Sequence, residues 1–227
     1  GTGTLNIDES RQLQLITQYY KSQGDDDYGL NLGKGFSAIR GTSTPFVSNG
    51  LNSDRIPGTE RHLISLQYSD SAFLGQELVG QVYSRDESLR FYPFPTVNAN
   101  KQVTAFSSSQ QDTDQYGMKL TLNSKPMDGW QITWGLDADH ERFTSNQMFF
   151  DLAQASASGG LNNKKIYTTG RYPSYDITNL AAFLQSGYDI NNLFTLNGGV
   201  RYQYTENKID DFIGYAQQRQ IAAGKAT

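Results

Sequence analysis

The sequence predicts an all-β fold, a partial antiparallel transmembrane β-barrel in which about seven strands of a larger barrel carry long extracellular loops. Three observations support this fold class: segments with alternating apolar and polar residues, short turns that alternate with very long connections, and a hydrophilic composition. Only 37% of the 227 residues are hydrophobic, the mean hydropathy is -0.59, and the chain has 22 glycines. A barrel with a polar interior, a thin lipid-facing band and polar loops has such a composition.

The clearest alternation lies in the segment 114–139. There Trp134 and Leu136 share one parity with the other apolar residues, whereas Thr133 and Asp137 have the opposite parity. Because successive side chains of a β-strand point to opposite faces, the segment has one apolar and one polar face. Turn-forming residues separate its two halves. The segment is therefore predicted to be a long hairpin.

The same alternation predicts five further strands, and residues 5–7 have the pattern of the end of another. The five strands cover residues 12–20, 61–68, 76–85, 180–188 and 194–205. The segments 148–157 and 211–223 are predicted to form short helices, since each precedes glycine, which often follows the last turn of a helix.

The connections between these strands are strongly asymmetric. Tight turns alternate with long loops, which are predicted at residues 22–59, 86–113 and 140–176. Short turns at one end and long loops at the other are the layout of an outer-membrane barrel. A soluble sandwich has no reason to send every long loop to the same end. The connections therefore favour the membrane barrel over the sandwich.

The composition and the motifs argue against several other functions. The histidines, His62 and His140, lie far apart and have no evident catalytic partner, so no enzyme is predicted. A net charge of -4 gives no reason to expect nucleic acid as a partner. The acidic run 25–27 does not match a calcium-binding loop, and a solvated loop is favoured there. The sequence has no cysteine, no apolar run long enough for a transmembrane helix and no signal-peptide pattern.

Three stretches of the chain carry a family resemblance. Residues 13–20, 68–76 and 81–86 resemble the early barrel strands of TonB-dependent siderophore receptors. The resemblance extends over essentially the whole chain. It implies a receptor in the bacterial outer membrane, in contact with its lipid, that takes up a ferric siderophore with energy supplied through TonB. It also implies a transporter with no cofactor of its own, since the iron is carried within the siderophore.

The resemblance carries expectations about domain organisation as well. It implies that residues 1–227 are part of the barrel domain, with the plug domain and the C-terminal end of the barrel outside this sequence. One departure from the family pattern is Ser84, where a second tyrosine is expected. Because Ser84 shares the apolar parity with Val82, the departure affects an aromatic contact with lipid and not the binding of a ligand.

The resemblance implies an anionic ferric chelate as the ligand, so the candidate ligand-binding residues are mainly arginines, because guanidinium groups bind carboxylates in bidentate fashion. Arg61, Arg85 and Arg201 have the polar parity, so we expect them to point into the barrel. The full set is Arg61, Arg85, Arg90, Tyr92, Arg142 and Arg201, with Phe94 and Arg171 as further loop candidates. The alternative is that these arginines pair with acidic residues of the barrel interior or of the plug.

Two other functions remain open from the sequence. One is a passive porin or an adhesive surface barrel, in which the long loops form a binding surface. The other is a soluble carbohydrate-binding β-sandwich, which would also use aromatic residues but would turn its apolar parity inward.

Overall fold

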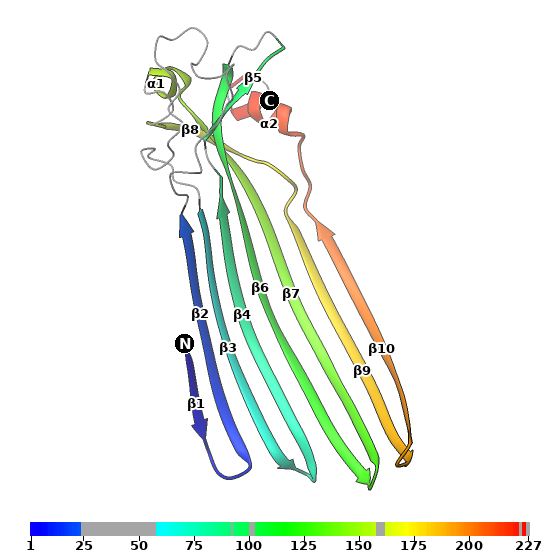
Figure 1. Cartoon of the computed structure of the whole chain (residues 1–227). Coiled ribbons are helices and arrows are strands. Elements are labelled where there is room, and N and C mark those ends of the chain that lie inside the picture. Colours follow the sequence, from blue (N-terminus) through cyan, green and yellow to red (C-terminus); the bar gives the residue numbers. More distant parts are fainter. Residues whose placement is uncertain (24–57, 92, 100–102, 158–161, 223, 226–227) are drawn as a thin grey trace.

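The chain forms one large antiparallel sheet (Figure 1). The computed structural model describes residues 1–23, 58–91, 93–99, 103–157, 162–222 and 224–225. Within these residues the sheet has ten strands in the order β1-β2-β3-β4-β6-β7-β9-β10, with β5 paired to β6 and β8 paired to β7. The all-β, antiparallel prediction is therefore confirmed, and β1 and β10 form the two edges of an open sheet.

Eight strands follow the main path of the sheet, and each pairs with the next along that path. They are β1 (Thr2–Asn6), β2 (Arg11–Gln23), β3 (Gly58–Phe73), β4 (Gln76–Arg90), β6 (Val103–Met127), β7 (Trp130–Phe150), β9 (Tyr175–Asn191) and β10 (Phe194–Ile209). Four shorter elements lie at the loop end of the sheet, opposite the tight turns (Figure 1). They are β5 (Phe94–Val97), β8 (Lys165–Gly170), α1 (Leu152–Ala157) and α2 (Tyr215–Ala222).

Each of the seven predicted strands lies inside an observed strand, but the observed strands are longer. The largest difference is in β6 and β7, which have 25 and 21 residues. The predicted loops 86–113 and 140–176 are therefore wrong over most of their length, because strand pairing continues to Phe106 and Phe150. Most of the predicted loop 22–59 lies outside the described residues.

The helix predictions had mixed outcomes. The segment 211–223 contains α2, so that helix is confirmed. The segment 148–157 is helical only from Leu152, and its first three residues belong to β7. There Met148 and Phe149 pair with β6 on one side and β8 on the other. Pairing on both sides outweighs the weak local preference of these residues for a helix.

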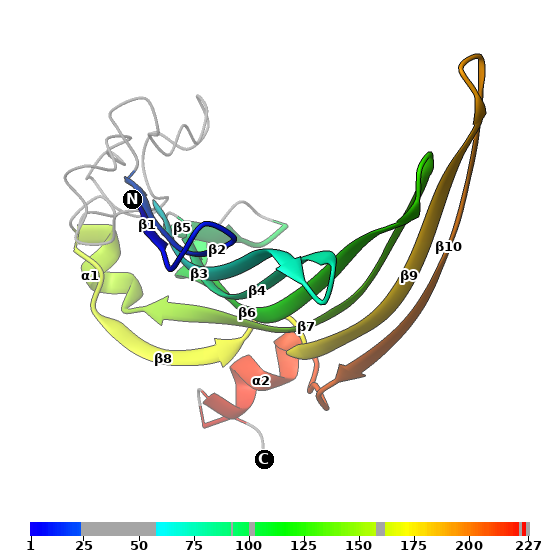
Figure 2. The same cartoon turned by 90° about the horizontal axis from the view of Figure 1, so that it is seen from below.

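The sheet is bent into a trough, as Figure 2 shows, and its two faces differ in composition. Leu66 and Met118 are 40% and 48% exposed, whereas Ser65 on the opposite parity is 3% exposed. Side chains converge on the concave side of a curved sheet and diverge on the convex side. The apolar parity is therefore convex and is called the outer face; the parity of Ser65 is the inner face.

The outer face carries an apolar band, which consists of the outer-face residues from Trp130 to Ala138 in β7 and their neighbours across the sheet. One row of these neighbours runs through Leu66, Val82, Met118, Ala138 and Leu180. Nine strand residues span about 30 Å along the strand, which in a tilted strand matches the lipid-facing band of a barrel. Beyond the band the outer face becomes polar at His140 and Arg142.

The inner face contains two close contacts between an aromatic ring and a glycine. A Cβ atom added to Gly117 would lie 2.7 Å from the hydroxyl oxygen of Tyr83, and one added to Gly135 would lie 2.5 Å from Cζ of Phe183. Both pairs are direct cross-strand partners. The glycines are needed here because only a residue without a side chain lets these rings lie on the strand.

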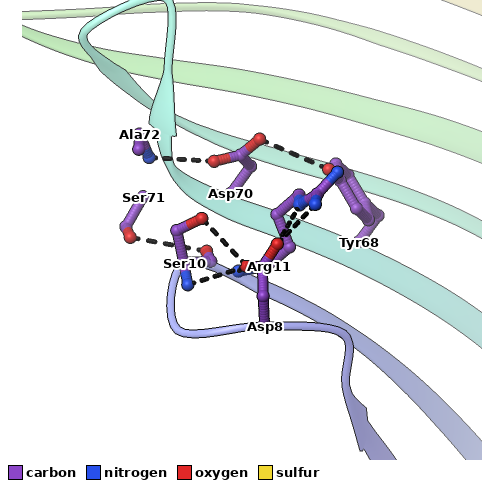
Figure 3. Close-up of polar contacts among 7 residues, drawn as sticks. All are labelled: Asp8, Ser10, Arg11, Tyr68, Asp70, Ser71 and Ala72. Atoms are coloured by element: carbon purple, nitrogen blue, oxygen red, sulfur yellow. Dashed lines mark hydrogen bonds and ion pairs between the residues drawn. The ribbon is translucent and has the colours of Figure 1, made fainter.

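Two tight turns are held together at the turn end (Figure 3). The carboxylate of Asp8 accepts hydrogen bonds from the backbone amides of Ser10 (2.9 Å) and Arg11 (2.8 Å) and forms an ion pair with the Arg11 guanidinium. The amide of Ser71, near the end of β3, donates to the Ser10 carbonyl at 3.0 Å. Arg11 and Ser10 together hold the pKa of Asp8 well below its ordinary value.

The loop end has a small hydrophobic core of its own. Phe106 and Phe150 are cross-strand partners, 0% and 2% exposed, and pack with Ala155 of α1. Val103, Met148 and Leu152 surround them. None of the helices in the described part of the chain is long and apolar enough to cross a membrane.

Candidate functional site

The three arginines that were predicted to point inward lie on the inner face. In the register of the sheet, Arg61 and Arg85 share the parity of Ser65 and Tyr83. Arg201 pairs with Phe183, whose ring lies over Gly135 on the same face. Their predicted placement is therefore confirmed.

Two of these arginines pair with carboxylates of the same face. Arg61 reaches Glu87 on the neighbouring strand, with its Nη2 and Nε atoms each 3.0 Å from Oε2. Arg201 extends over the ring of Phe183 to Asp137, and its Nη1 atom lies 2.7 Å from Oδ2. These pairs match the alternative that interior arginines are neutralised by interior acids. Both are partly solvated, so each pair contributes little to stability, about 0–1 kcal/mol.

Arg85 differs from the other two. It is half-buried in β4 between Leu63 and Gln115, its partners on the adjacent strands. Its Nε atom is buried without a hydrogen-bond partner, and no carboxylate within the described ranges forms an ion pair with it. A buried donor without a partner is costly, and of these three arginines Arg85 is the one that no described carboxylate neutralises.

Arg90 and Arg142 lie on the outer face of the sheet and not in ligand-binding loops. Both lie in strands, β4 and β7, so their prediction as loop residues is wrong. Their parity is that of the outer face, beyond the apolar band. Arg142 pairs with Asp176 at 3.1 Å, and Arg90 lies 3.8 Å from Glu60. Tyr92 lies outside the described residues.

A pocket of about 360 Å³ lies at the loop end and is lined by residues that the sequence did not bring together. The lining residues are Phe94, Thr96, Gln147, Arg171 and Tyr172. Phe94 pairs with Ser107 of β6, and the amide of Arg171 donates to the Ser145 carbonyl of β7 at 3.0 Å. Ser107 and Ser145 have the inner-face parity, so the pocket opens on the inner side of the sheet.

Sequence reasoning named Phe94 and Arg171 only as separate loop residues and missed Gln147. A signal for Gln147 was present, because the odd-numbered residues of β7 remain on the inner face as far as Phe149. The sequence prediction ended this strand at residue 139, whereas β7 continues to Phe150, so the parity was not applied to Gln147.

The remaining polar candidates form ordinary contacts. His62 lies 3.4 Å from Glu60, and His140 lies 3.3 Å from Asp176, both on the outer face. Among the described residues there is no group of three or more histidines and carboxylates that could hold a metal ion. The acidic run 25–27 lies outside the described part of the chain.

Comparisons with known proteins agree with this architecture. A family model described as "TonB dependent receptor-like, beta-barrel" matches residues 2–226. The ferric aerobactin receptor of Escherichia coli is 98% identical over all 227 residues. The rhizobactin receptor of Rhizobium meliloti (strain 1021) is 41% identical over 221 residues, 97% of this chain. The chain spans 31% and 30% of the lengths of these two relatives.

A solved structure has the same fold. The copper transporter OprC superposes on 92% of this chain with a TM-score of 0.60 and 15% sequence identity, and the matched part is 28% of that protein. At this identity the likeness supports the arrangement of strands and nothing about the ligand.

Proposed function

This chain belongs to the TonB-dependent receptor β-barrel family, and from that premise we propose that the whole protein takes up ferric aerobactin across the bacterial outer membrane. The observation that carries the proposal is the 98% identity to the ferric aerobactin receptor over the entire chain. Energy for the uptake would come from TonB through a plug region outside this sequence. No cofactor of its own is required, because the iron travels within the siderophore.

The two faces of the sheet suit a membrane transporter. The apolar band of the outer face contacts the lipid of the outer membrane, and the inner face lines the passage. An anionic ferric citrate-hydroxamate chelate entering this passage meets guanidinium groups, which bind carboxylates through paired, charge-assisted hydrogen bonds. Of the three strand arginines, Arg85 is the first candidate for such a contact, because no described carboxylate forms an ion pair with it, whereas Arg61 and Arg201 are paired.

Arg61 and Arg201 have a different part in this proposal. Each is already paired, with Glu87 and Asp137 respectively, so a ligand carboxylate must compete with an acid of the barrel. Competition of this kind lowers the gain from each contact and leaves the ligand free to move inward. We assign no ligand contact to Arg90 and Arg142, because they lie on the outer face.

The experiment uses the intact receptor in living cells. Uptake of ferric aerobactin labelled with radioactive iron is measured in cells with and without TonB, together with binding of the same complex to the cell surface. We expect uptake to require TonB while surface binding persists without it. Equal uptake in both strains would support a passive porin and overturn the proposal.

A variant links the proposal to the inner face. Arg85→Ala removes one charge-assisted contact and should weaken binding of ferric aerobactin by roughly 10- to 100-fold. The matched control is Lys208→Ala on the outer face of β10, where the Lys208 ammonium lies 3.3 Å from the Glu206 carboxylate. Unchanged affinity in Arg85→Ala would remove Arg85 from the site.

A further inference from the structure

The pocket at the loop end has a cation at its centre. The guanidinium of Arg171 lies 5.3 Å from the centre of the Tyr172 ring and 5.9 Å from that of Phe94. Both distances are within the range of cation–π contacts. None of the five lining residues is acidic. The pocket therefore presents positive charge with no carboxylate of its own.

Within the described ranges, most of the hydrogen-bonding capacity of the Arg171 side chain is unused. Its side chain donates from Nη1 to the Gln147 carbonyl oxygen at 3.2 Å, and no carboxylate among the residues described here forms an ion pair with it. A guanidinium has five N–H donors in a planar fork that matches the two oxygens of a carboxylate. Arg61, Arg142 and Arg201 are, by contrast, paired with acids.

A buried pair of side chains fixes the position of Arg171. Gln147 is 3% exposed, and its amide nitrogen donates to the hydroxyl oxygen of Ser107 at 2.7 Å. Ser107 is itself fully buried in β6. Because the amide nitrogen is engaged with Ser107, the carbonyl oxygen of Gln147 is directed toward Arg171. A side chain oriented in advance loses less conformational entropy when a ligand binds.

The size of the pocket indicates what it accepts. A volume of about 360 Å³ is near the lower limit for small-molecule sites. It therefore accommodates one part of a chelate and not the whole. The Phe94 and Tyr172 rings provide apolar walls beside the charge, which suits an anionic group next to a hydrocarbon segment.

We propose that Arg171, with Phe94 and Tyr172, forms an outer subsite that binds a carboxylate of the ferric siderophore, and that Gln147 and Ser107 are positioning residues for it. This inference rests on the proposed function and deepens it. The subsite lies at the loop end of the inner face, so an incoming ligand meets it before it reaches the strands of the apolar band.

The direct test measures binding of ferric aerobactin to the purified intact receptor in detergent, at several salt concentrations. Arg171→Ala should weaken binding by roughly 10- to 100-fold and reduce its dependence on salt. Arg171→Lys keeps the charge but loses the planar fork, so its affinity should fall between those of Arg171→Ala and the wild type. Lys208→Ala removes a cation from the outer face and should bind like the wild type.

A second pair of variants tests the positioning role. Gln147→Glu keeps an oxygen facing Arg171 but adds a negative charge that occupies the guanidinium, so it should weaken binding as strongly as Arg171→Ala. Gln147→Met keeps the approximate volume without the hydrogen bonds and should have a smaller effect. A Gln147→Met variant that binds as tightly as the wild type would contradict positioning of the guanidinium by Gln147.

The outcomes separate this inference from the function on which it rests. If the wild-type receptor does not bind ferric aerobactin, the proposed function fails. If the wild type binds and Arg171→Ala binds equally well with the same salt dependence, the subsite is wrong while the function stands. Thermal unfolding of each variant in detergent identifies those that fail to fold. If Arg171→Ala is among them, Arg171→Lys, which retains the cation–π contacts, tests whether Arg171 binds the ligand: affinity and salt dependence equal to the wild type would contradict the subsite.

Discussion

The apolar band and the loop end are built on the same two strands, β6 and β7, but their outer faces have different surroundings. In the band, Leu136 and Met118 are 42% and 48% exposed on the outer face. At the loop end, Phe106 and Phe150 are almost completely buried under α1. The comparison shows that β7 changes from a membrane-spanning to a globular environment between Ala138 and Phe150, without any break in its pairing with β6.

The different surroundings imply different sources of stability. The loop end depends on protein packing, in which a deleted side chain leaves a cavity. The band depends on the match between its outer face and lipid, where deleting an apolar group matters less than adding a charge. Substitutions of the same kind in the two regions should therefore have different effects.

The largest effect is expected in the core of the loop end. Phe150→Ala should destabilise this region by about 3–5 kcal/mol, because the side chain is 2% exposed and is packed against Phe106 and Ala155. Hydrogen exchange of the amides in α1 and β8 would measure the loss. The matched substitution Leu136→Ala in the apolar band should leave these amides protected. Equal exchange in the two variants would show that the loop end has no core of its own.

A charge in the apolar band should have the next largest effect. Leu184 lies in the middle of the outer-face residues of β9 and pairs with Trp134, so Leu184→Arg should cost about 2–4 kcal/mol on insertion into lipid. Gln185→Arg, on the inner face one residue away, is the matched control and should insert normally. Folding into lipid vesicles, followed by the change in gel mobility on heating, would measure both. Similar yields for the two variants would contradict the assignment of the faces.

A smaller effect is expected at the inner-face glycines. Gly135→Ala places a Cβ atom 2.5 Å from the Phe183 ring and against the Leu120 carbonyl, which should destabilise the barrel by about 1–3 kcal/mol. The control is Gly198→Ala, since nothing lies within 4 Å of the added Cβ there. Denaturant unfolding of the intact receptor would compare the two. A Gly135→Ala barrel as stable as Gly198→Ala would mean that the Phe183 ring moves aside freely.

The smallest effect concerns pH at the turn end. The pKa of the Asp8 carboxyl is lowered in the folded state, so its contribution is complete above the ordinary carboxyl pKa and is lost as the pH falls below that value. Hydrogen exchange of the Ser10 and Arg11 amides, corrected for intrinsic rates, should lose protection on acidification. Asp8→Asn removes the titrating group, and its corrected protection should not change with pH. A wild type that matched Asp8→Asn at every pH would leave Asp8 with no part in the turn.

Sequence patterns predicted the strands of the apolar band because lipid and the interior impose opposite polarity on alternate residues. The hairpin 114–139 has that alternation throughout. The extensions of β6 and β7 were missed because polarity no longer alternates there: Ser107, Ser108 and Ser109 are all polar and all buried. Where protein covers both faces of a strand, buried polar side chains can take the place of apolar ones. The alternation of apolar and polar residues that predicts a strand is then lost.

The candidate site was predicted in part for the same reason. Parity placed Arg61, Arg85 and Arg201 on the inner face, since their strands were recognised. Arg171 and Gln147 meet only because β5 and β8 pair with the extensions of β6 and β7. A contact of that kind depends on the register of strands that local sequence did not reveal.

We infer that the apolar parity of β7 faces lipid and that its polar parity faces the passage. The most direct test introduces single cysteines at positions 131 to 138 of the intact receptor in lipid, since this chain has none. A lipid-soluble thiol reagent should label positions 132, 134, 136 and 138, and a water-soluble reagent should label the positions between them. The reverse pattern, or labelling without alternation, would contradict the account.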